Sequence, residues 1–270
     1  MKIPHLVYGT FPDRPGSQHV IYKSPEISAE LETWLIHFYN NFGDCKNEDF
    51  KSSLTVFWYE DQQGQRLATI TRVSHQGRDF SGRWGALLRH TAVLSVEQFR
   101  EFLFDPFSIG ALLVSSGTSE ELSQIGEIEL EAQRSSEEFL TGIALRNLEI
   151  YRQNLQSIFK GDRLVLYSEK NNDLTNASLN ALISLLPFSV KKRLNWSEFI
   201  FRSLENLDIS LVHSSRYEEP SADPLHFTVS GKNCLSDLPE EFAGEYLSAL
   251  TAAIAAEDLP QLQILMMQES

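Results

Sequence analysis

Residues 54–59 read LTVFWY and residues 67–73 read LATITRV, and these two stretches decide the fold of the N-terminal half. Both are rich in β-branched and aromatic residues, which favour strands. The loop between them, residues 61–64, has the length of a β-hairpin connection. Because the first stretch is apolar or aromatic at nearly every position, we expect it to be covered on both faces. The pattern therefore predicts an antiparallel hairpin buried within the fold.

Further elements surround this hairpin in the N-terminal half. Strands are predicted at residues 5–11, 20–24 and 88–94. The clearest helix begins at Ser28, where Glu30 and Glu32 place carboxylates at the positive end of the helix dipole. Its apolar residues recur at a spacing of three and four, and Gly43 is expected to end it. A second helix is expected from near Val96.

The C-terminal half follows a stretch rich in Ser, Gly and Glu, residues 115–133, which marks the predicted domain boundary. A long helix is expected over residues 136–160, with Gly161 at its C-cap. Further strands are predicted at residues 164–167, 199–201, 209–213 and 225–229, and further helices at residues 179–186 and from about residue 239. Antiparallel hairpin signals outnumber βαβ alternation. The sequence therefore predicts an α+β fold of mainly antiparallel strands flanked by helices, in two subdomains, residues 1–130 and 131–270.

The composition is that of a globular, acidic protein. Hydrophobic residues make up 42% of the 270 residues and aromatic residues 11%, which is enough for a packed core and argues against disorder. Lys and Arg number 23 against 37 Asp and Glu, a formal net charge of −14. A surface this acidic repels phosphate backbones, so we expect no nucleic-acid partner. Solubility alone accounts for the charge.

The chain carries the signals of a cytoplasmic protein. Cys45 and Cys234 lie far apart, whereas disulfide scaffolds are dense in Cys and zinc sites use closely spaced ligands. The first residues lack a basic region followed by an apolar stretch. No apolar run reaches the roughly 20 residues that cross a bilayer. We therefore expect a cytoplasmic location, reduced cysteines and no membrane span.

The sequence lacks the common signatures of catalysis. It contains no phosphate-binding loop, no dinucleotide-binding glycine pattern, and no His-Glu-x-x-His, Cys-x-x-Cys or Gly-x-Ser-x-Gly motif. Its seven histidines are scattered, with no helical pair four residues apart. We therefore expect a binding or regulatory module with no catalytic residue, cofactor or metal.

One segment, residues 72–90, concentrates basic side chains in this acidic chain: Arg72, His75, Arg78, Arg83, Arg89 and His90. Three glycines within it allow unusual backbone torsions or a close approach to a ligand. Arginine forks suit phosphate or carboxylate recognition, and loops between strands commonly carry function. The alternative is a structural connection whose arginines pair with the surplus acidic residues, with Asp79 as an internal partner of Arg83.

Three blocks of the chain resemble a family of bacterial GTPase-associated proteins of biological conflict systems, over its N-terminal and middle domains. The blocks occur in the family's order and consist of short motifs: Tyr8-Gly9-Thr10, Gly16 and Ser24-Pro25; Arg72, Asp79, Gly82-Arg83, Gly85 and His90; and Leu182 to Leu186, Pro187, Arg193 and Trp196 to Phe201. The resemblance implies a non-catalytic adaptor that works with a GTPase or effector in antiphage defence. Its motif positions in this chain are the expected binding residues: Tyr8, Arg72, Asp79, Arg83 and His90.

Two alternatives to the adaptor remain open. A small hydrolase or phosphate-ligand-binding enzyme would use the 72–90 segment, and it requires Asp79, Arg83 and His90 to converge on one point. A self-assembling scaffold would instead form concentration-dependent oligomers and have no other partner.

Overall fold

The computed structural model describes residues 2–16, 18–40, 50, 52–83, 85–102, 105–129, 148–168, 173–200, 206–213, 227–235 and 238–268. The chain divides into two compact units: residues 1–133 with 199–204, and residues 134–198 with 205–270. The strands of the first unit pair antiparallel, those of the second unit pair in both directions, and helices accompany both, so the predicted α+β class is confirmed. The boundary predicted after residue 130 falls in the range 130–147, which lies outside the described residues.

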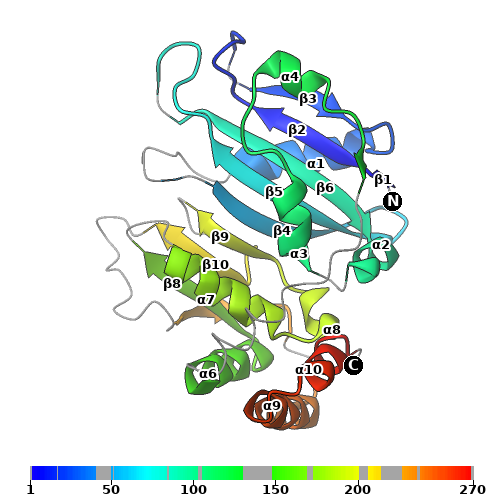
Figure 1. Ribbon diagram of the computed structural model, residues 1–270, viewed down its shortest axis with the longest axis vertical. Helices are drawn as coiled ribbons and strands as arrows, with labels where there is room; N and C mark the ends of the chain where they lie inside the picture. The colour runs from blue at the N-terminus through cyan, green and yellow to red at the C-terminus, as the bar shows by residue number, and fades with distance from the viewer. Residues whose placement is uncertain are drawn as a thin grey trace. The chain divides into compact units, whose positions relative to one another are not determined.

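The first unit is built on an antiparallel sheet in the order β4-β5-β6-β2-β3 (Figure 1). Its strands are β2 (His5–Gly9), β3 (His19–Lys23), β4 (Ser52–Glu60), β5 (Arg66–His75) and β6 (Leu87–Ser95). All five strands predicted in this half are present. The predicted hairpin is β4–β5, and seven consecutive residues of β4 are buried, as expected for a strand covered on both faces. A separate antiparallel pair joins β1 (Lys2–Ile3) to β7 (Ile128–Glu129).

The register of this sheet decides which side chains share a face. Arg72 of β5 lies opposite His90 of β6, whereas Arg89 lies opposite Tyr8 of β2. Because successive side chains of a strand point to opposite faces, Arg89 and His90 point in opposite directions. The sequence segment 72–90 is therefore divided between the two faces of the sheet.

Helix α1 (Ala29–Asn40) covers the face that carries Arg89, and in Figure 1 it lies behind the sheet. Its Phe38 packs on Phe57 of β4 with ring centroids 4.0 Å apart. As predicted, the helix begins after Ser28, whose hydroxyl accepts a hydrogen bond from the Leu31 N–H at 3.1 Å. Gly43, predicted as its end, lies outside the described residues.

Helices α2 (Val96–Glu101), α3 (Pro106–Leu112) and α4 (Ser119–Ser123) complete the first unit. The predicted start near Val96 is confirmed, and Ser95 forms a capping box with Gln98. Helix α3 lies on the face that carries His90, where Gly110 allows close contact with β4: a Cβ at this position would lie 2.6 Å from Leu54 Cδ1. The sequence did not predict α3 or α4, because helices this short show no amphipathic period.

The second unit contains strands β8 (Asp162–Ser168), β10 (Ile209–His213), β11 (Thr228–Lys232) and the first three residues of β9 (Trp196–Ile200). Strand β8 pairs in parallel with β10 and antiparallel with β11. Strand β11 begins three residues later than predicted. All five of its residues are exposed, so hydrophobic alternation does not mark its position.

The helices of the second unit are α6 (Leu148–Phe159), α7 (Asp173–Ser184), α8 (Phe188–Lys191), α9 (Glu240–Ala255) and α10 (Leu259–Met266). Gly161, with φ of 80°, follows the end of α6 as predicted. The rest of the predicted 136–160 helix, residues 136–147, lies outside the described residues. None of the helices in the described part of the chain is long and apolar enough to cross a membrane.

Candidate functional site

The five residues predicted as a binding set occupy three different places in the first unit. Tyr8 points to the face under α1, and Arg72 and His90 point to the opposite face. Asp79 and Arg83 lie in the connection between β5 and β6. The enzyme alternative requires Asp79, Arg83 and His90 to converge on one point. The structure places them apart, so this requirement is not met.

His90 is fully buried and is held by hydrogen bonds at both ring nitrogens. The Val114 N–H donates to its Nδ1 at 2.9 Å, so the His90 proton is on Nε2. That Nε2 lies 2.9 Å from His5 Nδ1, and His5 Nε2 lies 2.7 Å from the Gly126 carbonyl oxygen. The pattern requires both rings to be neutral and protonated on Nε2, which links β2, β6 and the segments around residues 114 and 126.

Burial keeps this histidine pair neutral. It lowers the pKa of His90 to about 3, with the nearby His5 as a second cause. Burial also lowers the pKa of His5, and the hydrogen bond to Gly126 opposes that shift. His90 has no exposed surface. It therefore exchanges no proton with a substrate in this conformation, and its role is to tie four segments of the fold together.

Arg72 serves the same face of the sheet. Its Nη1 donates to the Leu113 carbonyl oxygen at 3.2 Å, next to the residue whose N–H bonds His90. The side chains of Arg72 and His90 thus fix the segment that follows α3 by one hydrogen bond each. Both contacts are to backbone, so the structure accounts for these two residues without a ligand.

Tyr8 is buried under α1 and belongs to an aromatic and cationic group. Its ring stacks on Tyr39 with centroids 5.5 Å apart, and its hydroxyl donates to the side-chain oxygen of Gln18. The guanidinium carbon of Arg89 lies 5.8 Å from the centroid of each ring. Burial raises the pKa of Tyr8, so it is a neutral phenol at neutral pH.

Asp79 and Arg83 lie in the surface loop of residues 76–86 that joins β5 to β6, of which residue 84 lies outside the described residues. We call it the hairpin loop, and it is distinct from the loop of the β4–β5 hairpin. Its base is closed by the Gln76 N–H donating to the Ala86 carbonyl at 2.8 Å, and its tip by the Asp79 N–H donating to the Arg83 carbonyl at 2.8 Å. Gly77 and Gly82 both have φ of 81°, a conformation that side chains disfavour. These glycines set the path of the loop.

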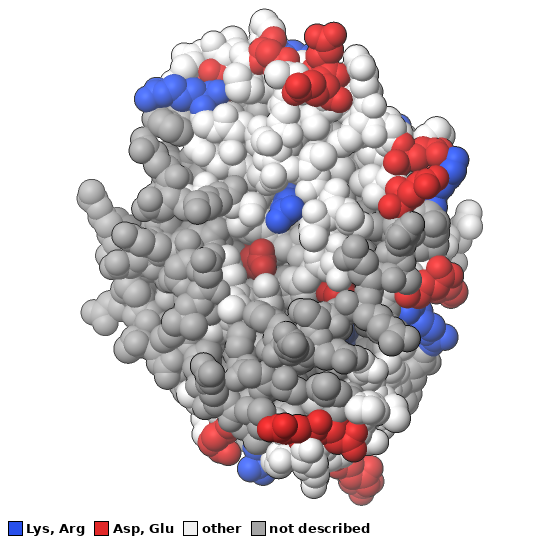
Figure 2. All heavy atoms as spheres, in the orientation of Figure 1, with Lys and Arg blue, Asp and Glu red and all other residues white. Residues whose placement is uncertain are grey.

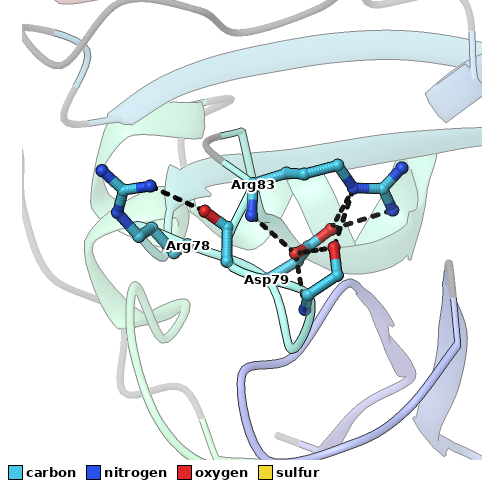
Figure 3. A network of polar contacts seen from close by, with 5 residues as sticks. Arg78, Asp79 and Arg83 are labelled. Atoms are coloured by element: carbon cyan, nitrogen blue, oxygen red, sulfur yellow. Dashed lines mark hydrogen bonds and ion pairs between the residues drawn. The ribbon is translucent and has the colours of Figure 1, made fainter.

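The carboxylate of Asp79 organises the tip of the hairpin loop (Figure 3). Its Oδ1 accepts from the Ser81 N–H at 2.8 Å, the Ser81 hydroxyl at 2.6 Å and the Arg83 N–H at 2.9 Å. Its Oδ2 lies 3.1 Å from both Nε and Nη2 of Arg83. These contacts lower the pKa of Asp79 to about 2, and the hydrogen bond from the Ser81 hydroxyl has the largest effect. The predicted internal pair of Asp79 and Arg83 is therefore present.

Three large side chains in the described part of the hairpin loop are exposed to solvent. The Arg83 side chain is 74% exposed although it contacts Asp79, and Phe80 is 45% exposed. Arg78 is also exposed, and its Nη1 donates to the Gly82 carbonyl at 2.7 Å. The Asp79 side chain is only 8% exposed, because its own loop covers it. Among the described residues of the loop, two cations and one aromatic ring thus project from a hydrogen-bonded backbone.

This arrangement suits binding and offers little for catalysis. The Asp79 oxygens are already occupied, and its low pKa keeps it ionised. No three His, Cys, Asp or Glu side chains of the described residues are placed to hold a metal ion. Neither models of known protein families nor curated proteins give a match to this chain.

The predicted binding set did not include three residues that the fold brings to these positions: His5, Tyr39 and Arg89. Arg89 stood within the basic segment, and its separation from His90 follows from strand alternation. The partnership of His5 with His90 has no signal in the sequence, since it depends on the pairing of β2 with β6. Tyr39 resembled any other core residue of the apolar stripe of α1.

Proposed function

We propose that this chain is a non-catalytic interaction module that docks a protein partner through the hairpin loop. The observation that carries the proposal is the exposure of Arg78, Phe80 and Arg83 on a tip that Asp79 fixes by hydrogen bonds. Fixed backbone lowers the entropy lost on binding. Arginine and aromatic residues are enriched among the side chains that dominate protein interfaces.

The chemistry of the loop favours an acidic partner surface with an apolar pocket. Arg78 and Arg83 carry two positive charges against the single negative charge of Asp79, whereas the whole chain has a formal net charge of −14. On the face drawn in Figure 2, acidic side chains cover more area than basic ones. The loop is thus a local exception to the charge of the protein, and opposite charge on a partner would steer the two together.

The family resemblance of the sequence supports a GTPase or an effector of a bacterial conflict system as that partner, and the cytoplasm as the place where they meet. Two of the family's motif positions, Asp79 and Arg83, lie in the hairpin loop. The three others, Tyr8, Arg72 and His90, lie inside the unit and support the sheet from which the loop projects. A non-catalytic role agrees with the neutral, buried state of His90.

Affinity purification of the tagged chain from its native cells, with and without guanine nucleotides, tests this proposal. We expect the wild type to recover a GTPase or effector in stoichiometric amount. The variant Arg78→Ala/Phe80→Ala/Arg83→Ala should lose it without a change in melting temperature, because these side chains are exposed. The control Arg14→Ala/Arg152→Ala removes two exposed arginines elsewhere and should recover the partner. Equal recovery by the loop variant and the wild type would refute docking through this loop.

A further inference from the structure

Arg89 is a buried cation whose hydrogen-bonding capacity is largely unused. It projects from β6 toward α1 and is 4% exposed. Its Nη2 donates to the Tyr39 carbonyl oxygen at 3.4 Å, near the end of α1. Its Nε and Nη1 have no hydrogen-bond partner in the described part of the chain. Buried charged groups in proteins are ordinarily paired and hydrogen-bonded, so this guanidinium lacks acceptors along most of its edge.

The surroundings of Arg89 offset its charge only weakly. The rings of Tyr8 and Tyr39 lie 5.8 Å from the guanidinium carbon, close to the roughly 6 Å limit of cation–π contacts. Burial raises the pKa of Tyr39 to about 12 and that of Tyr8 in the same direction, so neither phenol is a counterion at neutral pH. Ring faces attract a cation, but they do not accept its in-plane N–H groups in the way an oxygen does.

The same face of the sheet carries a cluster of buried polar groups beside Arg89. The Tyr39 and Thr71 hydroxyls both bond Thr91, the latter at 2.8 Å. Ser53 lies in the same cross-strand row as Arg89, with Val73 between them, and its buried hydroxyl has no hydrogen-bond partner among the residues that the structure describes. Arg89 and Ser53 thus both have unused hydrogen-bonding capacity on one buried face of the sheet.

We infer that Arg89 is the cationic end of an enclosed site for a small oxyanion, a carboxylate or phosphate group whose oxygens accept from Nε–H and Nη1–H. Guanidinium is the side chain best matched to these oxyanions, because its planar N–H groups meet two oxygens at once and it is weakly hydrated. Tyr8, Tyr39 and the sheet would shield the pair from water, which strengthens the interaction.

The lowered pKa of Arg89 is consistent with a guanidinium that lacks an anionic partner among the described residues. Burial lowers the pKa of Arg89 to about 10, and a bound carboxylate or phosphate would oppose that shift. The site lies under α1 and does not include the hairpin loop, so it does not depend on the docking function proposed above. The structural alternative is that Arg89 only caps the last turn of α1, by donating to the Tyr39 carbonyl oxygen.

Thermal unfolding in potassium phosphate, potassium acetate and potassium chloride, at equal ionic strength and pH 7.5, tests the inference. We expect phosphate or acetate to raise the melting temperature of the wild type by about 3 °C or more over chloride. The arm that responds identifies the oxyanion. Arg89→Met should lose this response, and its melting temperature in chloride should equal or exceed that of the wild type, because it removes an unpaired buried charge. Arg14→Met, which makes the same change at an exposed arginine, should keep the response.

Three outcomes would overturn the site: no response of the wild type to either anion, the same response in Arg89→Met, or loss of the response in Arg14→Met. If Arg89→Met does not fold, Arg89→Lys decides. Its ammonium keeps the charge but not the planar fork, so the apparent affinity for the anion should fall at least about tenfold. An unchanged affinity in Arg89→Lys would also contradict the assignment.

Discussion

His90 donates its Nε2–H to His5 Nδ1 at 2.9 Å across the pair of strands β6 and β2. Each ring has its other nitrogen bonded to backbone, His90 by the Val114 N–H and His5 by the Gly126 carbonyl. A second proton on either ring would sit on Nδ1. On His90 it would face the Val114 N–H, and on His5 it would face the Nε2–H of His90. The two histidines therefore function as neutral linkers, and the stability of the first unit depends on their neutrality.

The first unit should lose stability in mild acid. The pKa of His90 is about 3 when folded, against about 6.5 for an unfolded histidine. Between these values the unfolded chain binds one more proton, so the free energy of unfolding decreases as pH falls from about 6.5 toward 3. The slope from this group is about 1.4 kcal/mol per pH unit. Denaturant unfolding at pH 7.5, 6.0 and 5.0 measures it.

The variant His90→Asn tests whether His90 causes this pH dependence of the free energy of unfolding. Its side-chain oxygen can accept from the Val114 N–H but does not titrate, so the stability of this variant should depend less on pH over the same range. His19→Asn is the matched control, since His19 begins β3 and its Nε2 lies 2.9 Å from the Pro15 carbonyl oxygen in an exposed contact. A pH slope that persists unchanged in His90→Asn would assign acid sensitivity to other groups.

Truncation of the pair should be costly. His90→Ala leaves the Val114 N–H and His5 Nδ1 buried without partners and opens a cavity between β6 and the segment around residue 114. We expect a loss of about 3–5 kcal/mol in the free energy of unfolding at pH 7.5, measured by urea denaturation. A loss below about 1 kcal/mol would show that the histidine pair is not a structural link.

The tip of the hairpin loop should loosen when Asp79 is replaced. Asp79→Ala removes the acceptor of the Ser81 and Arg83 N–H groups, so hydrogen exchange at both amides should accelerate while the melting temperature changes little. The Asp79→Ala variant should also capture less of the partner protein, because the tip of the hairpin loop is no longer fixed. Asp61→Ala makes the same change in the β4–β5 loop, where Asp61 accepts from the Gln63 and Gln65 N–H groups. That control should bind the partner normally, and equal loss of binding in both variants would point to a general effect.

Two glycines on helices should respond in opposite directions to alanine. At Gly110 of α3 a Cβ would lie 2.6 Å from Leu54 Cδ1, so Gly110→Ala should destabilise the first unit by about 1–3 kcal/mol. At Gly244 of α9 nothing lies within 4 Å of that position. Gly244→Ala should therefore stabilise the protein by about 0.5–1 kcal/mol. Thermal unfolding of both variants tests the two predictions. Stabilisation by Gly110→Ala would show that α3 packs less closely on β4 than this 2.6 Å approach implies.

Much of the fold could be predicted from sequence because its signals are local. The α1 stripe, the β4–β5 hairpin and the C-cap at Gly161 each depend on residues close together in the chain. Pro260 likewise stands in the first turn of α10, where proline is favoured, and Asp258 caps that helix. The parallel pairing of β8 with β10 was not foreseen, because it joins strands far apart in sequence.

The candidate site was harder to predict than the fold. The sequence drew attention to the basic segment 72–90, and the Asp79–Arg83 pair was anticipated. Its division between a surface loop and two buried faces depends on strand register, which composition does not contain. The isolation of Arg89 likewise becomes visible only when its neighbours in space are known.

Photo-crosslinking in native cells tests the docking surface most directly. A photoreactive phenylalanine analogue at Phe80 would stand at the tip of the hairpin loop, and the same analogue at Val229, which is 52% exposed on β11, would serve as the control. We expect a covalent adduct with one protein, a GTPase or an effector, from position 80 and none from position 229. No adduct from position 80, or an adduct between two copies of the chain, would contradict the adaptor function, and the second result would favour the self-assembling scaffold.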